Sequence, residues 1–114
     1  MWEPDLIRLR HMLEAAREAL SFVEGQTRRD LESDRKLVLS LVREIEVIGE
    51  AASKVSSEAK AEFPGLPWQD IIGMRNRLVH VYFDVDLDVV WDSVTKDLPE
   101  LIRLLQAAVA RSSN

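Results

Sequence analysis

A short polar cluster near residue 80 holds the side chains of this sequence that are best suited to chemistry. Arg75 and His80 are five residues apart, and Asn76 and Arg77 follow the arginine directly. Histidine has the ordinary pKa nearest to neutrality, so it can act as a general acid or base. The planar guanidinium of arginine bonds phosphate oxygens and stabilises charge that builds up on phosphorus. Such a pair can cleave RNA without a metal, because a base takes the 2′-hydroxyl proton and that oxygen then attacks the adjacent phosphate.

The element that must position these residues is a helix expected from about Trp68 to Val81. Arg75 stands where the apolar period of this helix requires an apolar residue. A guanidinium keeps its proton, so burial there requires an acceptor or an anion close by. Arg75 and His80 lie about 140° apart around such a helix, whereas Asn76 and His80 lie four residues apart on one face. A two-fold pairing with a second copy would bring Arg75 and His80 from both chains into one cleft.

Hydrophobic periodicity predicts three further long helices and one short helix around that segment. Their expected bounds are Pro4 to Glu24, Asp30 or Asp34 to Val55, Ser57 to Phe63 for the short one, and Leu87 to about Ala110. Short connections between amphipathic helices favour antiparallel neighbours. The chain is therefore predicted to be all-α, an antiparallel four-helix bundle with an extra short helix, and to form a single domain over residues 1–114.

Glycine, proline and aspartate mark the expected boundaries and irregularities of these helices. Gly25 fits the position just past the first helix, and Asp84 or Asp86 can cap the last one. Pro99 should bend that last helix because proline removes a backbone donor. Gly49 lies in the middle of the second helix, where it costs about 1 kcal/mol against alanine. Close approach of another helix would explain a glycine there.

Composition bounds the class of protein. The chain has 114 residues, of which 46% are hydrophobic and 31% charged, as expected for a globular fold. It has no cysteines, which excludes disulfides and thiolate metal sites and suits a reducing cytoplasm. Neither a secretory signal nor an apolar run of roughly 20 residues is present, so no membrane association is expected. The net charge of −5 means that any nucleic-acid role must be local.

The run Arg75-Asn76-Arg77-Leu78-Val79-His80-Val81-Tyr82 resembles the Arg-x4-His-x-Tyr motif of the HepT-like HEPN family. Members of this family are small helical toxins of bacterial and archaeal toxin–antitoxin pairs. Similar features recur at Ile48–Ala51, Trp68–Ile71, Val90-Trp91 and Leu98-Pro99, so the resemblance spans about residues 34–105. It implies a bundle of HEPN type.

The resemblance also implies an activity and two protein partners. The activity is that of an RNase acting as a homodimer, with Arg75 and His80 as the catalytic pair where the two motifs meet. Asn76 is the polar residue that often follows the arginine, and Arg77 is either a phosphate contact or part of a solvated face. The second partner is an antitoxin, a minimal nucleotidyltransferase that transfers AMP to Tyr82. No metal or other cofactor is expected.

Three functions stay open on the sequence. The first is a metal-independent endoribonuclease toxin, and the second is a non-catalytic dimer that holds a nucleotide or positions a nucleotidyltransferase. The third is a plain dimerisation bundle, which gives no reason for an arginine on an apolar stripe. The net charge of −5 favours the second function, because RNA binding normally needs a positive field.

Other residues are expected to be structural. Glu46 and Glu50 lack a matched histidine, so they are more typical of a salt-bridged face than of a metal site. The pair Gly49-Glu50 is expected to support helix packing and to hold Arg75 or a backbone group. Trp68 and Trp91 are expected to be packing anchors, and His11 a surface residue.

Overall fold

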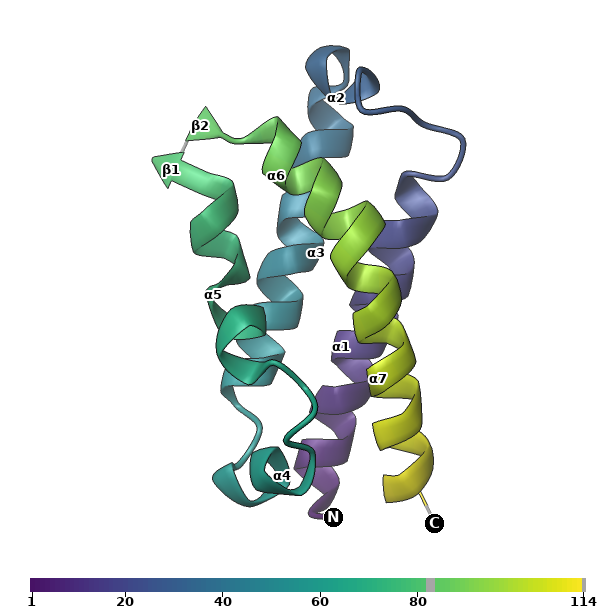
Figure 1. Cartoon of the computed structure of the whole chain (residues 1–114), viewed down its shortest axis with the longest axis vertical. Coiled ribbons are helices and arrows are strands. Elements are labelled where there is room, and N and C mark those ends of the chain that lie inside the picture. Colours follow the sequence, from purple (N-terminus) through teal and green to yellow (C-terminus); the bar gives the residue numbers. More distant parts are fainter. Residues whose placement is uncertain (82–83, 114) are drawn as a thin grey trace.

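The long helices lie side by side along the main axis of an elongated molecule of 44 × 29 × 19 Å (Figure 1). In this computed structural model the described residues are 1–81 and 84–113, with the backbone alone for His80 and Val81. The bundle consists of α1 (Glu3–Phe22), α3 (Arg35–Ser53), α5 (Trp68–Leu78) and α7 (Leu98–Ser112). Shorter elements are α2 (Asp30–Ser33), α4 (Ser57–Glu62), α6 (Leu87–Asp92), the π-helical turn η1 (Ser93–Asp97), and strands β1 (Val79–Val81) and β2 (Asp84–Val85).

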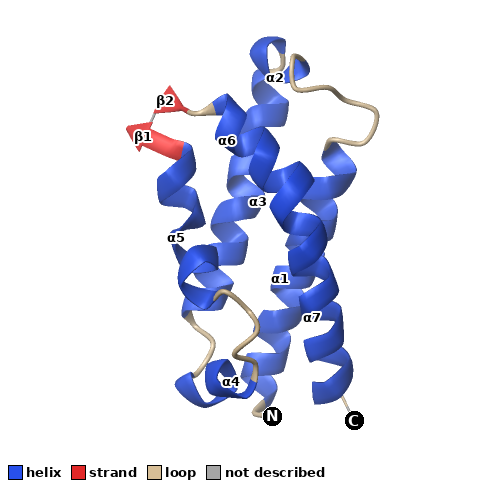
Figure 2. Ribbon diagram, in the orientation of Figure 1, coloured by secondary structure: helices blue, strands red, loops and turns tan. Residues whose placement is uncertain are grey.

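This architecture confirms the prediction of an all-α bundle, since the ribbon is almost entirely helical (Figure 2). Helix α3 packs against α1 on one side and α5 on the other, and α7 packs against α1. Side chains from these four helices, together with α6 and η1, form one buried core. Its largest fully buried members are Leu9, Met12, Val38, Leu41, Ile45, Ile48, Ile71, Leu78, Val90, Val94, Leu98 and Leu105. None of the helices in the described ranges is long and apolar enough to cross a membrane.

Capping residues decide where the helices begin and end. The Asp34 side chain accepts a hydrogen bond from the Leu37 N–H at 3.0 Å, so α3 begins after Asp34 rather than at Asp30. Asp86 does the same for the Val89 N–H at 3.1 Å, so Asp86 rather than Asp84 caps the last helical segment. Helix α1 ends at Phe22, two residues earlier than predicted, and Gly25 lies in the turn that follows it with a φ of +77°, which glycine adopts without strain.

The last helical segment is interrupted just before Pro99. Helix α6 continues into η1, and Pro99 then stands in the first turn of α7. Because proline has no N–H, the preceding turn lacks one helical hydrogen bond and can widen to the π-helical form. Figure 1 shows α6 running obliquely to α7, which agrees with the predicted bend at Pro99.

The helix predicted to reach Val81 is shorter than expected. Helix α5 ends at Leu78, and Val79–Val81 pairs as β1 with the antiparallel strand β2. Val79 lies opposite Val85 in an extended conformation, with φ −120° and ψ 110°. Branched side chains such as valine tolerate extended backbone well, and pairing with β2 stabilises that conformation in place of the last turn of the helix. The expectation that Asn76 and His80 share one helical face is therefore wrong.

Candidate functional site

Arg75 lies on the exposed face of α5, one turn before the helix ends. The buried stripe of this helix is formed by Trp68, Ile71, Met74 and Leu78, at spacings of three, three and four. Met74 thus fills the apolar position, and the next residue is turned out of the core by about 100°. The prediction that Arg75 interrupts the apolar stripe is wrong, because its side chain is 44% exposed.

The acceptor that the sequence required for Arg75 is nevertheless present, on α3. Arg75 Nε donates a hydrogen bond to Glu46 Oε2 at 3.1 Å, and the Glu46 side chain is 34% exposed. An ion pair this exposed adds at most about 1 kcal/mol to stability. Its main effect is geometric, because the carboxylate selects the direction in which the guanidinium points.

Glu50, which was expected to hold Arg75 or a backbone group, has another partner. Glu50 Oε1 pairs with Lys54 Nζ at 3.5 Å, one turn along the same helix. Glu46 and Glu50 are therefore each engaged with a cation, as predicted for a salt-bridged face. Among the described residues, no group of three or more Asp, Glu or His side chains is arranged to hold a metal.

The pairing of Glu46 with Arg75 depends on a close approach of α3 and α5 at Gly49. A Cβ atom built on Gly49 would lie 3.3 Å from the carbonyl oxygens of both Ile71 and Ile72. This confirms the predicted close approach at this glycine. Glu46 lies three residues before Gly49 and so on the same face of α3. The spacing between Glu46 and Gly49 was the signal that could have identified Glu46 as the partner of Arg75.

Two of the predicted site residues share one hollow, and a third lies apart from them. Arg75 and Asn76 line a shallow hollow of about 310 Å³ between α3 and α5, with Arg43 on its α3 side. Arg77 lines a different hollow of about 270 Å³, formed by α5 together with η1 and α7. Arg75 and Arg77 therefore face different neighbours, and of the other predicted site residues with a described side chain, Asn76 shares the hollow with Arg75.

His80 comes two residues after the end of α5 at Leu78. Strand β1 continues directly from Leu78, so its backbone carries His80 just beyond the end of α5. The His80 side chain and all of Tyr82 lie outside the described residues, and the roles expected for them stay predictions. On the far side of this segment the Asp86 N–H donates a hydrogen bond to the Leu78 carbonyl at 2.7 Å, which closes the loop at its base.

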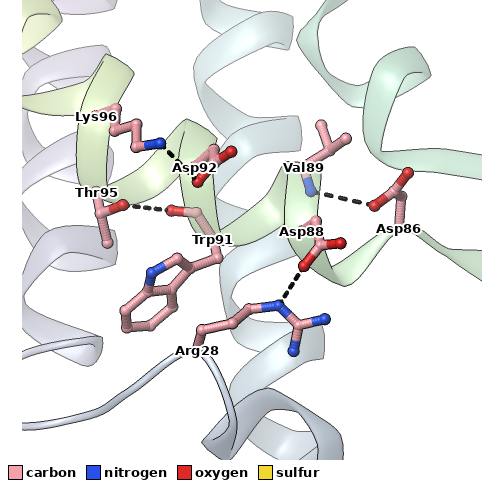
Figure 3. A network of polar contacts seen from close by, with 8 residues as sticks. All are labelled: Arg28, Asp86, Asp88, Val89, Trp91, Asp92, Thr95 and Lys96. Atoms are coloured by element: carbon pink, nitrogen blue, oxygen red, sulfur yellow. Dashed lines mark hydrogen bonds and ion pairs between the residues drawn. The ribbon is translucent and has the colours of Figure 1, made fainter.

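Polar contacts anchor the helix that follows this loop (Figure 3). Arg28, just before α2, donates from Nε to Asp88 Oδ1 at 2.6 Å. Lys96 pairs with Asp92 at 3.3 Å along the same segment. The Arg28–Asp88 pair links α6 to the segment before α2, whereas the Lys96–Asp92 pair and the Asp86 cap lie within the α6–η1 segment itself. Figure 1 shows that β1 and β2 lie at the end of the bundle opposite to the two termini.

A perturbed carboxyl group lies on the α1 side of α3, away from Arg75. The pKa of Glu44 is raised to about 7, first by burial and then by the neighbouring Glu18 on α1, while Arg43 acts in the opposite direction. Glu44 Oε2 is buried and receives no hydrogen bond from a fixed donor in the described part of the chain. A proton on one of these two carboxyl groups lets them share a hydrogen bond.

Comparison with known proteins places the chain in a family. The sequence model described as "Ribonuclease HepT-like" matches residues 12–108. A protein of Thermococcus cleftensis provisionally named ribonuclease HepT is 37% identical over 93 residues, which cover 78% of this chain and 84% of that protein. A protein of Caldanaerobacter subterraneus subsp. tengcongensis provisionally named an RNase is 34% identical over 93 residues, which cover 82% of this chain and 83% of that protein. No solved structure matches with comparable significance. The chain therefore belongs to the HepT-like ribonuclease family.

Proposed function

We propose that this protein is the toxin of a toxin–antitoxin pair, a metal-independent endoribonuclease with a composite Arg75/His80 site at a homodimer interface. The observation that carries the proposal is the exposed guanidinium of Arg75, oriented by Glu46 at the end of a helix that leads directly to His80. Membership of the HepT-like ribonuclease family supports the same activity.

The proposed reaction is transesterification at one phosphate. His80 takes the proton from the 2′-hydroxyl of the substrate, and the freed oxygen bonds to the adjacent phosphorus. Arg75 binds the non-bridging oxygens as charge grows on them. The bond from phosphorus to the 5′-oxygen breaks, and the imidazole of the second copy protonates that oxygen as it leaves. The products are a 2′,3′-cyclic phosphate end and a 5′-hydroxyl end.

The test is cleavage of a labelled RNA by the purified, dimeric protein in EDTA. Arg75→Ala and His80→Ala should each lower the rate by a factor on the order of 100 or more, as expected for loss of a charge-stabilising or proton-transferring group. Arg10→Ala is the matched control, since this exposed arginine lies on α1 and donates to Ser113 Oγ at 3.2 Å. No cleavage by wild type, after mass spectrometry has excluded an adduct on Tyr82, would contradict the nuclease.

Silencing is proposed to occur by modification of Tyr82. A minimal nucleotidyltransferase antitoxin would bind the toxin and present ATP, the tyrosine oxygen would attack the α-phosphorus, and pyrophosphate would leave. Tyr82 is the only tyrosine of the chain and stands two residues after His80, where an added AMP would obstruct the site. Incubation with the antitoxin and ATP should add one AMP moiety to wild type and none to Tyr82→Phe.

The net charge of −5 favours a second candidate, a non-catalytic dimer that binds a nucleotide or positions the nucleotidyltransferase. The cleavage assay separates the two functions. An unmodified wild-type protein that forms a complex with the nucleotidyltransferase but leaves RNA intact would favour this second function.

A further inference from the structure

A second hollow lies on the other side of α3 from Arg75, between α3 and α1. Its volume is about 500 Å³, and its cationic lining residues are Arg8 from α1, Arg43 from α3 and Lys54 directly after α3. Pro4, Ile7 and Val47 give it an apolar wall, and Ile7 is 42% exposed. We call this hollow the strand groove. It combines positive charge with exposed apolar surface, a combination that suits a nucleic-acid strand better than a small anion.

The strand groove adjoins the hollow that contains Arg75. Arg43 and Glu50 line both of them, so the two hollows meet across the exposed face of α3. An extended ligand that reached Arg75 would therefore pass over Arg43 to enter the strand groove. This continuity links the groove to the proposed reaction centre rather than leaving it as an isolated surface feature.

The charge of this surface is opposite to that of the whole chain. The two hollows are lined by four cationic side chains, Arg8, Arg43, Lys54 and Arg75, and two carboxylates, Glu46 and Glu50, a local charge of +2. The chain as a whole carries −5. Both carboxylates are already engaged, Glu46 with Arg75 and Glu50 with Lys54. Within the described ranges neither Arg8 nor Arg43 forms an ion pair, although Arg43 is close enough to Glu44 to lower its pKa.

The Arg8 side chain is held at the groove by the backbone. Its Nη1 donates to the Lys54 carbonyl at 3.0 Å, which directs the guanidinium across the gap between α1 and the end of α3. This bond uses one of its five donors, and the others can reach phosphate oxygens. Arg43 is exposed on the α3 side of the same groove.

From these contacts we infer that the strand groove binds the part of a single-stranded RNA that lies outside the cleaved phosphate, with Arg43 and Arg8 on successive phosphates. The inference rests on the proposed nuclease function. An unpaired strand is required because only unpaired bases expose faces that can pack against Ile7 and Val47. The strand groove therefore specifies the substrate of the proposed nuclease as single-stranded RNA several nucleotides long.

Charge also sets where the strand leaves the groove. Beyond His11 and Val47 the gap between α1 and α3 continues into a hollow lined by three glutamates, Glu14, Glu18 and Glu44. Phosphates are repelled there, and they are attracted at the opposite end by Arg8 and Lys54. The strand therefore runs from Arg75 over Arg43 to Arg8, which lies near the N-terminal end of α1.

The direct test uses a fluorescein-labelled 2′-O-methyl oligonucleotide of about 12 nucleotides, within the size range of single-strand sites. This probe cannot be cleaved, so its binding does not depend on catalysis. Arg8→Gln/Arg43→Gln should raise its Kd on the order of tenfold and flatten the plot of log Kd against log salt, by about 0.7 per lost phosphate contact. The matched control is Arg10→Gln/Arg17→Gln, which makes the same charge change at two exposed residues of α1 that do not line the groove.

Two further arms make the outcome clear. Arg43→Gln alone keeps the Arg8 bond to the backbone, so it tests the groove if the double variant loses stability. In cleavage, the KM of the long RNA should rise more than that of a dinucleotide in the groove variant. Equal Kd values for wild type, groove variant and control, or no binding by wild type, would contradict the inference that the strand groove binds single-stranded RNA. Cleavage that persists alongside such a result would leave the nuclease intact.

Discussion

Helix α3 is attached to its two neighbours by different means. Toward α1 it contributes large side chains, including Leu41 and Ile45, to a continuous apolar core. Toward α5 it presents Gly49, whose missing side chain lets the Ile71 and Ile72 carbonyl groups come close. The contact with α1 is stabilised by the hydrophobic effect, whose free energy is proportional to the apolar surface removed from water. The α5 side combines buried side chains, such as Ile71 and Leu78, with this close backbone approach at Gly49.

This difference has a functional consequence. Arg75 sits on the helix that is held at the narrow contact, and its partner Glu46 lies one turn from that contact on α3. We expect a small shift of α5 to move the guanidinium more than it disturbs the contacts between α3 and α1. We therefore expect substitutions on the two sides of α3 to separate stability from the orientation of Arg75.

The largest effect is expected from Gly49→Leu, which breaks the close contact directly. The new side chain must displace α5 backbone, because even its Cβ would lie 3.3 Å from two carbonyl oxygens. We expect the free energy of unfolding to fall by about 1–3 kcal/mol, as for other overpacked sites. Thermal unfolding followed by circular dichroism measures this change, and RNA cleavage should fall with it because Arg75 moves away from Glu46.

Gly73→Ala is the matched control for Gly49→Leu. This glycine also lies inside a helix, α5, but no heavy atom comes within 4 Å of a Cβ built there. Alanine should therefore stabilise the protein by up to about 1 kcal/mol through helix propensity. If Gly49→Leu were as stable as wild type, the contact between α3 and α5 would not be the close packing described above.

A smaller effect, confined to catalysis, is expected from Glu46→Gln. Loss of the carboxylate releases the Arg75 guanidinium from its fixed direction, and we expect kcat for RNA cleavage to fall about tenfold with KM little changed. Stability should change by less than about 1 kcal/mol, since the pair is partly exposed. Glu50→Gln makes the same change one turn along α3, where the partner is Lys54, and should leave kcat near the wild-type value. Equal rates for the two variants would argue against a positioning role for Glu46.

The smallest effect is expected on the α1 side, from Glu44→Gln. The pKa of Glu44 is about 7 in the folded protein, against an ordinary value of 4.5, so the folded state binds more protons than the unfolded state between these values. Stability from this group is therefore present at low pH and lost as pH rises from about 5 to 8. Glutamine should remove this slope and stabilise the protein at about pH 8 by less than 1 kcal/mol, because the group is partly solvated.

Urea unfolding at about pH 5 and pH 8 measures the predicted slope. Glu58→Gln, an exposed site on α4 with the same change of charge, is the control. A variant at Glu44 that keeps the wild-type dependence on pH would show that the two glutamates do not share a proton.

Local sequence signals predicted most of the fold. Hydrophobic spacing identified the helices, and Asp34 and Asp86 are caps that the structure confirms, whereas α1 ends two residues before the position that Gly25 suggested. These signals succeed because capping and amphipathic periodicity involve residues only a few positions apart. The same local reasoning failed at the end of α5, where pairing of β1 with β2 ends the helix at Leu78. That pairing depends on residues after the loop, which helical periodicity does not consider.

The sequence by itself determined the family motif and most of the helices. It also called for an acceptor beside Arg75, but on the ground of a burial that the structure does not show, and only the structure placed Arg75 one turn from the end of α5. The tertiary structure alone decided that the acceptor is Glu46 rather than Glu50, that Met74 fills the core position, and that Arg77 faces α7. Arg75 and Glu46 are 29 residues apart in the chain. They meet because two helices approach closely at Gly49, and the rotation and spacing of packed helices are set by contacts between elements rather than by the sequence of either one.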